Sequence, residues 1–260
     1  SGSALLNYYP AFAEAFYSQI PLIVVSADRP LDKIDIGDGQ TIRQQNVFEN
    51  HSLYNANLSE NASPDNDMLI QKAIHFSIEK KGPVHINIPF EEPLYETTNQ
   101  LTVNPYIIDF ETDKISLENI EKYVQIWNAS TQKMILAGSM NPNIIEDSVT
   151  QFLANDTSVG VLTEKCSNWH HPKFISNIDT LITPFKEHDF EKFKPDLLIT
   201  FGGMIVSKRI KTFLRNYKPK HHWHIDPLRA YDVFGCLTKH FECSPNDFFK
   251  MLIRDSVKNL

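Results

Sequence analysis

Residues 21–48 read PLIVVSADRPLDKIDIGDGQTIRQQNVF, and this stretch decides the fold class. Its apolar, β-branched start predicts a strand over 22–27, which Pro30 ends. In an open parallel sheet, ligands bind just beyond the carboxyl ends of the strands. Arg29 stands at such an end, so the stretch predicts an α/β protein in which Arg29 binds a carboxylate or a phosphate. The alternative is a surface arginine that only follows a strand.

Composition indicates a globular protein and disfavours several classes of partner. The 260 residues are enough for one large domain or two ordinary ones, and 42% hydrophobic with 22% charged residues is typical of globular proteins. A net charge of −7 disfavours nucleic acid and anionic membranes as partners. No apolar run approaches the roughly 20 residues of a membrane span. The three cysteines lack CxxC spacing, which predicts reduced thiols in a cytoplasmic protein.

The first part of the chain alternates helices and strands. Apolar residues at helical spacing predict a helix over 4–18, with Ser3 as a possible cap. The strand 22–27 follows, then a second helix over 67–80 and a strand over 84–88. Because this order begins with a helix, we expect its first strand to lie upstream and the chain to be a piece of a longer protein. Residues 1–95 are therefore predicted as the C-terminal half of a doubly wound domain.

The second part repeats the same rhythm. Residues 96–115 are polar and aperiodic and are predicted as a linker. Over 116–260, strands are predicted at 133–137, 159–163, 196–201 and 222–226, and helices at 117–127, 144–153, 207–216 and 246–258. Short connections between alternating elements imply a parallel, Rossmann-like sheet of about five strands, covered on both faces.

A second candidate anion site follows the strand 196–201. Gly202-Gly203 ends this strand, and Ser207-Lys208-Arg209 opens the next helix. Free N–H groups at a helix N-terminus, together with two cations, favour an anion. The alternative is a solvated basic helix, because further lysines and arginines continue the run.

Two patterns suggest a metal, but neither predicts one. Gly37-Asp38-Gly39 with Asn66 matches the spacing of a Mg²⁺-diphosphate motif, but a polar loop precedes it where that motif needs a buried strand. The second pattern is His221-His222-Trp223-His224 together with His170-His171, but in the strand only His222 and His224 share a face, and no CxxC or HExxH motif accompanies them. We therefore predict no metal ligands. Asp226 stands where a Rossmann acid would bind a ribose, but GxGxxG spacing is missing.

Several motifs together resemble one enzyme family. They are Ser1-Gly2-Ser3-Ala4, Asn7-Tyr8-Tyr9-Pro10, residues 21–30, Gln40-Thr41-Ile42-Arg43-Gln44, residues 82–90 and Glu92-Pro93-Leu94-Tyr95. They are similar to the 2-succinyl-5-enolpyruvyl-6-hydroxy-3-cyclohexene-1-carboxylate synthases of menaquinone biosynthesis, which depend on thiamine diphosphate. The match is dense over 1–95 and sparser over 130–260, where Leu136-Ala137-Gly138 and Ser207-Lys208-Arg209 carry it.

The resemblance implies a fold and an activity. Residues 1–95 would be half of a pyrimidine-binding domain, and 116–260 the central Rossmann-like domain. The full-length enzyme would be a transferase that decarboxylates 2-oxoglutarate and adds the resulting carbanion to isochorismate. It would use thiamine diphosphate and Mg²⁺, whose diphosphate ligands are not expected in this chain. The chain alone would then be inactive, and the enzyme a cytoplasmic homodimer or homotetramer.

The resemblance also implies roles for single residues. Arg29, Lys208 and Arg209 match binders of the dicarboxylate substrates, with the latter two supplied by the central domain. Gln40 matches a catalytic amide near the cofactor and its covalent intermediate, and Ser3 and Asn7 match residues near the aminopyrimidine. Many family members carry Asn just before that Gln, where this chain has Gly39. The alternative reading is a non-catalytic module that binds ADP or FAD, or that serves oligomerisation, in a related enzyme.

Overall fold

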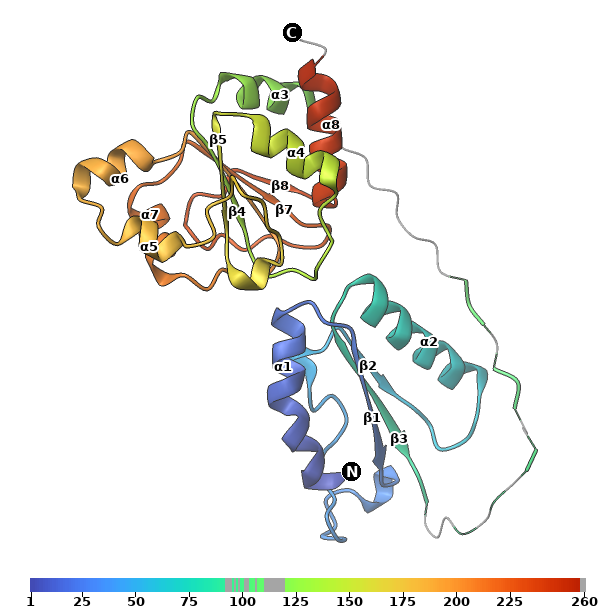
Figure 1. Cartoon of the computed structure of the whole chain (residues 1–260). Coiled ribbons are helices and arrows are strands. Elements are labelled where there is room, and N and C mark those ends of the chain that lie inside the picture. The colour runs from blue at the N-terminus through green and yellow to red at the C-terminus, as the bar shows by residue number, and fades with distance from the viewer. Residues whose placement is uncertain are drawn as a thin grey trace. The chain divides into compact units, whose positions relative to one another are not determined.

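The computed structural model describes residues 1–91 and 120–257, and between them residues 95, 97, 99–100, 103–105 and 107–109. The chain divides into two compact units, Ser1–Thr112 and Asp113–Leu260 (Figure 1). Much of the predicted linker 96–115 and the start of the predicted helix 117–127 lie outside the described residues. Each unit is built on a parallel sheet of its own, so the predicted α/β fold class is confirmed.

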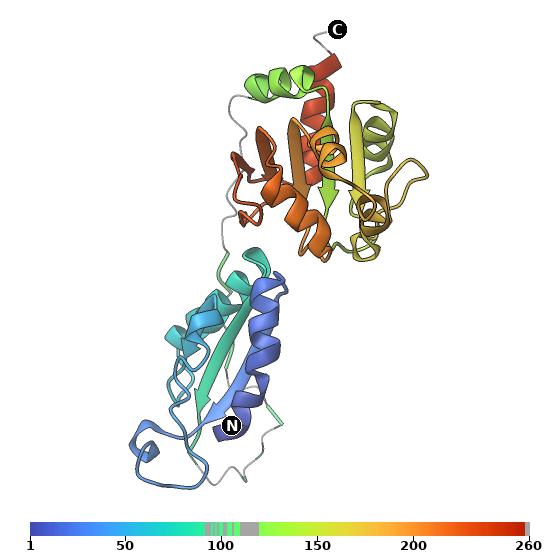
Figure 2. The same cartoon turned by 90° about the vertical axis from the view of Figure 1, so that its left-hand side faces the viewer.

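The first unit contains a sheet of three strands in the order β1-β3-β2, with both pairs parallel. Helix α1 lies on one face of this sheet and α2 on the other (Figures 1 and 2). The elements in chain order are a 3-10 helix Gly2–Tyr8, α1 Tyr9–Tyr17, β1 Leu22–Asp28, 3-10 helices Leu31–Lys33 and Glu49–His51, β2 Tyr54–Asn57, α2 Pro64–Glu79 and β3 Pro83–Pro89.

The N-terminal helix differs from its prediction. Residues 2–8 form a 3-10 helix, and the α-helix begins only at Tyr9. Pro10 explains this start, because proline lacks an N–H and fits only the first turn of an α-helix. Ser3 therefore lies inside the 3-10 helix and caps nothing. By contrast, Ser63 caps α2, accepting a hydrogen bond from the Asn66 N–H at 3.2 Å.

The second unit contains a sheet of five strands in the order β5-β4-β6-β7-β8, with all neighbours parallel. The predicted parallel sheet of about five strands is confirmed, and four of its strands were located from the sequence. Its elements are α3 Ile120–Ala129, β4 Lys133–Ala137, α4 Asp147–Asn155, β5 Val159–Thr163, a 3-10 helix Lys165–Ser167, α5 Ile178–Ile182, α6 Glu187–Phe193, β6 Leu197–Phe201, α7 Lys208–Asn216, β7 His221–Ile225, β8 Lys239–Phe241 and α8 Pro245–Val257.

Side chains alternate along the strands of this sheet into two apolar cores. Ile135 and Ala137 of β4 face the core formed with α3, α4 and α8, while Met134 and Leu136 face the core formed with α5 and α7. Figure 1 shows α3, α4 and α8 on one side of the sheet and α5, α6 and α7 on the other. Strands buried on both faces are typical of parallel sheets.

Besides the 3-10 helices, two short α-helices and two short strands escaped the prediction: α5, α6, β2 and β8. Strand β2 reads Tyr-Asn-Ala-Asn and β8 reads Lys-His-Phe, and neither has the apolar run that marks a strand. Both are edge strands, where polar residues face solvent. Among the described residues, no helix is long and apolar enough to cross a membrane.

Candidate functional site

Arg29 lies directly after the carboxyl end of β1, as predicted. Asp28 is the last residue of that strand and pairs in register with Pro89 of β3. The Arg29 N–H donates to Asp28 Oδ1 at 2.9 Å, and the Arg29 residue is half-buried. The backbone of Arg29 is therefore fixed by the side chain that precedes it.

Asp28 belongs to a buried polar network formed by Ser26, Asp28, Gln44, His85 and Asn87. Asn87 donates from Nδ2 to Asp28 Oδ2 at 2.7 Å, and its Oδ1 accepts from Ser26 Oγ at 2.9 Å and from Gln44 Nε2 at 3.0 Å. These bonds pair the polar atoms of Ser26, Asn87 and Gln44 inside the unit, whereas His85 Nδ1 is buried without a hydrogen-bond partner among the described residues. The network thereby ties the ends of β1 and β3 to the loop that carries Gln44.

The loop in turn holds the N-terminal 3-10 helix. Gln44 donates to the Ala27 carbonyl at 2.9 Å and accepts from the Gly2 N–H. Gly2 has φ +59°, and a Cβ there would stand 2.3 Å from the Gln40 carbonyl oxygen, so only glycine fits. The structure thus places the backbone of Gln40 against Gly2, the neighbour of Ser3. The side chains of Ser3, Asn7 and Gln40 are exposed.

His85 is the titratable group at the centre of this network. Its Nε2 lies 2.7 Å from Ser26 Oγ, and the Phe48 ring meets it edge to face with centroids 5.0 Å apart. Burial lowers the pKa of His85 to about 4, and the nearby Asp28 carboxylate offsets only part of this effect. His85 is therefore neutral at pH 7, and because Ser26 gives its only proton to Asn87, His85 Nε2 is the donor to Ser26.

Sequence reasoning missed this network. Its signal lies in the alternation of β1, where Val24, Ser26 and Asp28 are the buried positions. A strand face that changes from apolar to polar at its carboxyl end indicates a hydrogen-bonded site rather than core.

The GDG pattern takes no part in the network. Gly37-Asp38-Gly39 lies in an exposed loop, where the Asp38 carbonyl accepts from the Thr41 hydroxyl at 2.8 Å. Asn66 closes the loop before α2, accepting from the Ser59 N–H at 2.9 Å and donating to the Asn61 carbonyl at 2.8 Å. Asp38 thus bonds within its loop, and Asn66, in the first turn of α2, holds the loop before that helix.

The second predicted anion site lies at the start of α7. The Glu164 carboxylate accepts from the N–H groups of Val206 at 2.8 Å and Ser207 at 2.6 Å. Ser207 Oγ accepts from the Ile210 N–H at 3.2 Å. The N–H groups of Val206, Ser207 and Ile210 are thus bonded within the chain. Lys208 and Arg209 are exposed, and their part in an anion site stays a prediction.

The glycines after β6 pack two loops together. The Gly203 N–H donates to the Ser139 carbonyl at 2.7 Å, and a Cβ at Gly138 would stand 2.1 Å from the Gly203 carbonyl oxygen. These loops leave neighbouring strands β4 and β6, whose connections run to opposite sides of the sheet. That is the topological switch point where α/β proteins bind nucleotides. Here the backbone groups at that point bond to each other.

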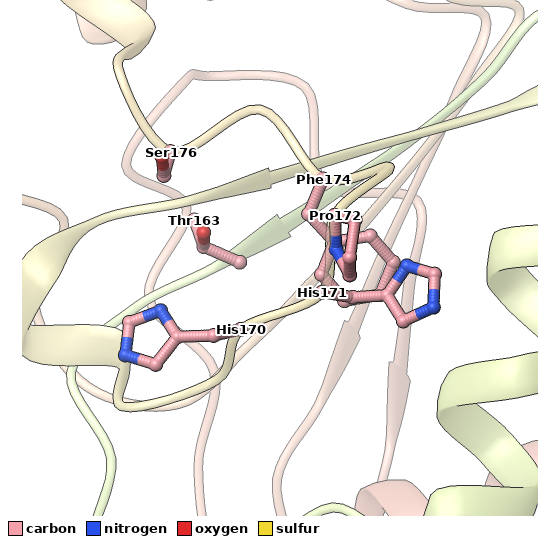
Figure 3. A pocket seen from close by; sticks show the side chains of 6 residues that line it. All are labelled: Thr163, His170, His171, Pro172, Phe174 and Ser176. Carbon is pink, nitrogen blue, oxygen red and sulfur yellow. The ribbon is translucent and has the colours of Figure 1, made fainter.

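Two cavities open beyond β4 and β5. One, of about 240 Å³, is lined by Thr163, His170, His171, Pro172, Phe174 and Ser176 (Figure 3). The other, of about 230 Å³, includes Met140, Asp147, Thr150 and Trp169. None of the predicted site residues lines either cavity. Asp226 lies apart from both, and its Oδ1 accepts from the N–H groups of Leu228 at 2.8 Å and Arg229 at 3.0 Å.

Comparison with known proteins supports the resemblance. The chain is 67% identical over 253 residues to the 2-succinyl-5-enolpyruvyl-6-hydroxy-3-cyclohexene-1-carboxylate synthase of Flavobacterium psychrophilum, covering 97% of this chain and 46% of that protein. It is 64% identical to the synthase of Flavobacterium johnsoniae, with the same coverage, and 51% identical to that of Christiangramia forsetii, covering 92% and 46%. The chain thus spans about half the length of these relatives.

A solved structure shares the fold. The thiamine diphosphate-dependent 4-hydroxybenzoylformate decarboxylase of Rhodococcus jostii RHA1 matches with a TM-score of 0.61 and 16% identity, over 95% of this chain and 48% of that one. A family model described as "Middle domain of thiamine pyrophosphate" matches residues 102–257. Because that match takes in more than half of the chain, the chain belongs to the thiamine pyrophosphate middle-domain family.

Proposed function

We propose that this chain is part of a thiamine diphosphate-dependent transferase of menaquinone biosynthesis. The enzyme would decarboxylate 2-oxoglutarate and add the resulting carbanion to isochorismate. The observation that carries the proposal is the 67% identity, over 97% of the chain, to a protein named as this synthase. We place the enzyme in the cytoplasm as a homodimer or homotetramer.

Both substrates are dicarboxylates, so the site needs several cations. Arg29 is suited to this role because its backbone N–H is bonded to Asp28, whose carboxylate is in turn held by Asn87. Its guanidinium can bind a carboxylate with two hydrogen bonds. Lys208 and Arg209 are exposed at the start of α7 and would contribute charge through their side chains.

The cofactor would meet the polar surface next to Gly2. The close contact between Gly2 and the Gln40 backbone gathers Ser3 and Gln40, which can hydrogen-bond a heteroaromatic group. Thiamine diphosphate, when bound, supplies the stabilised carbanion. We assign Gln40 the task of orienting developing charge with its amide, and Ser3 and Asn7 that of binding the ring. Asp38 and Asn66 do not fit Mg²⁺, so we assign its ligands to other residues.

A nucleotide-binding module is the competing function. The paired loops at Gly138 and Gly203 argue against it, because they close the switch point between β4 and β6. Thermal shift of the 260-residue chain with ADP or FAD tests it directly. Stabilisation by several degrees would favour the nucleotide module over the transferase.

Arg29→Ala tests the assignment of the carboxylate site. The substitution is made in the full-length enzyme. We expect the KM for one or both dicarboxylates to rise at least tenfold, because a charge pair to the substrate is lost. The affinity for thiamine diphosphate should stay unchanged. Arg215→Ala is the matched control. This exposed arginine lies in the last turn of α7, and among the contacts described it bonds only to the Val233 carbonyl. Unchanged kinetics with both substrates in Arg29→Ala would overturn the assignment.

A further inference from the structure

The second unit holds a cluster of three metal-ligand side chains that the proposed function does not use. His222 lies on β7, and Asp232 and Cys236 lie in the loop between β7 and β8. Their ligand atoms all lie within 4.8 Å of one another, and Cys236 Sγ is 3.8 Å from His222 Nδ1. We call these residues the His–Asp–Cys cluster.

We propose that the His–Asp–Cys cluster binds a zinc ion. In tetrahedral zinc sites the Zn–S bond is about 2.3 Å and the Zn–N bond about 2.0–2.1 Å, which holds sulfur and nitrogen about 3.6 Å apart. The observed separation of 3.8 Å is within a few tenths of an ångström of this value. Zinc can therefore be seated by small side-chain shifts, without rebuilding the backbone.

The surroundings of His222 are compatible with the tautomer that a metal needs. His222 Nε2 lies 2.9 Å from Thr200 Oγ1, and the same hydroxyl lies 2.8 Å from His224 Nδ1. A hydroxyl donates one hydrogen bond and accepts up to two, so Thr200 can accept from His222 Nε2 whatever its role toward His224. When it accepts from His222 Nε2, the lone pair of His222 lies on Nδ1, facing Cys236. Metal-bound histidines commonly have such a second hydrogen bond, which sets their tautomer.

Burial keeps this lone pair available. His222 is 1% exposed, so bulk water does not compete with an ion for its ring nitrogens. The Cys236 thiol must release its proton to solvent as the metal–sulfur bond forms.

Asp232 shapes the loop and offers the third ligand. Its Oδ1 accepts from the N–H groups of Cys236 at 2.8 Å and Leu237 at 3.0 Å, which turns the loop so that the thiol faces His222. A carboxylate has two oxygens, so these bonds are compatible with metal coordination. His222 is buried, Cys236 half-buried and Asp232 exposed. The ion would enter from the Asp232 side, and water would complete its coordination.

The ligand set also selects the ion. Sulfur and imidazole nitrogen favour zinc, whereas Mg²⁺ takes oxygen ligands in octahedral geometry. The site is thus distinct in chemistry from any Mg²⁺ that a thiamine diphosphate enzyme uses. The zinc proposal stands or falls independently of the proposed transferase activity.

The test is metal titration of the 260-residue chain. After chelator treatment, Zn²⁺ is titrated in competition with a chromophoric chelator, and Co²⁺ is followed by absorption. We expect one ion per chain at micromolar affinity or tighter, a thiolate-to-cobalt charge-transfer band, and no displacement by millimolar Mg²⁺. Asp232→Asn and Cys236→Ser should each weaken zinc binding at least tenfold, and Cys236→Ser should abolish the band. Thr200→Val should weaken binding about tenfold through the lost second hydrogen bond.

Controls separate metal loss from misfolding. Cys166→Ser removes another half-buried thiol, which lies 3.9 Å from Glu164 Oε2, and should leave zinc affinity unchanged. Asp232→Asn keeps an oxygen that can accept the two loop hydrogen bonds, so it preserves the fold, and the tryptophan fluorescence of the second unit, which includes Trp223 on β7, checks this. The proposal is overturned if no stoichiometric zinc binds, or if folded Asp232→Asn and Cys236→Ser bind zinc as the unchanged chain does.

Discussion

Strands β1 and β4 both contain an apolar run, but their surroundings differ. All five residues of β4 are buried, because helices cover both faces of its sheet. On β1, an edge strand, Val24 is buried against Phe12 and Phe48, while Ile23 is 41% exposed and Val25 60% exposed. The same kind of sequence thus gives a strand with two covered faces in one unit and one covered face in the other. Hydrophobicity marks a strand, but the neighbouring elements decide how much of it is buried.

The largest effect is expected from a pair of truncations, one in each unit. Ile199→Ala in β6 removes a side chain that is 0% exposed, and should lower the free energy of unfolding of the second unit by about 2–5 kcal/mol. Val25→Ala in β1 should change that of the first unit by less than about 0.5 kcal/mol. Trp127, Trp169 and Trp223 are the chain's three tryptophans, all in the second unit, so fluorescence in urea reports that unit. Amide hydrogen exchange reports the first.

Equal losses in the two units would contradict the comparison. They would mean that Val25 is covered in solution, for example by a second copy of the chain. Repeating the exchange measurement at several protein concentrations separates these cases, because only an association depends on concentration.

The same difference explains what could be predicted from the sequence. β4 and β5 coincide with the predicted strands 133–137 and 159–163, since long apolar runs mark buried strands. β2 and β8 were missed because edge strands are short and polar. Arg29 was predicted at a strand end, where it lies, but Gln44 and Asn87 were not singled out. Their roles depend on contacts between residues more than 40 positions apart, such as the Gln44–Asn87 bond.

The predicted anion site at α7 shows a second limit of prediction from sequence. The sequence indicates where a helix begins, but it cannot show that Glu164, 43 positions before Ser207, binds the N–H groups there. For the same reason the His–Asp–Cys cluster was overlooked, because loop folding between β7 and β8 brings Asp232 and Cys236 to His222. The expected contributions of Arg29, Lys208 and Arg209 to one substrate site stay predictions.

Acid should lower the free energies of unfolding of the two units by different amounts, and this difference should be smaller than that between the truncations. Burial lowers the pKa of His85 in the first unit, and of His222 and His224 in the second, to about 4, below the value of about 6.5 for an unfolded chain. The unfolded state therefore binds protons first, so stability is full above about pH 6.5 and is lost as the pH falls toward 4. Each histidine contributes on the order of 1–3 kcal/mol. The second unit, with two such groups, should lose more.

Urea unfolding at pH 7 and pH 4.5, followed by fluorescence and hydrogen exchange, measures this loss. His188→Asn is the matched control, because its side chain is 65% exposed and should leave the pH dependence unchanged. A second unit whose stability is flat across this pH range would show that His222 and His224 are protonated in the folded state. Metal-free buffer is needed, since a bound ion would also be lost on acidification.

The smallest expected effect on stability, and the one that most sharpens the comparison, is Val25→Lys. The side chain is exposed, so the free energy of unfolding should change by less than about 0.5 kcal/mol. A lysine on an exposed edge strand opposes pairing with another strand, so self-association measured by sedimentation velocity should fall. Ile36→Lys changes an equally apolar residue, 68% exposed in the loop before Gly37, and should leave association unaltered. If both substitutions reduced association alike, general apolar exposure would be the cause; a reduction confined to Val25→Lys assigns it to the uncovered face of β1.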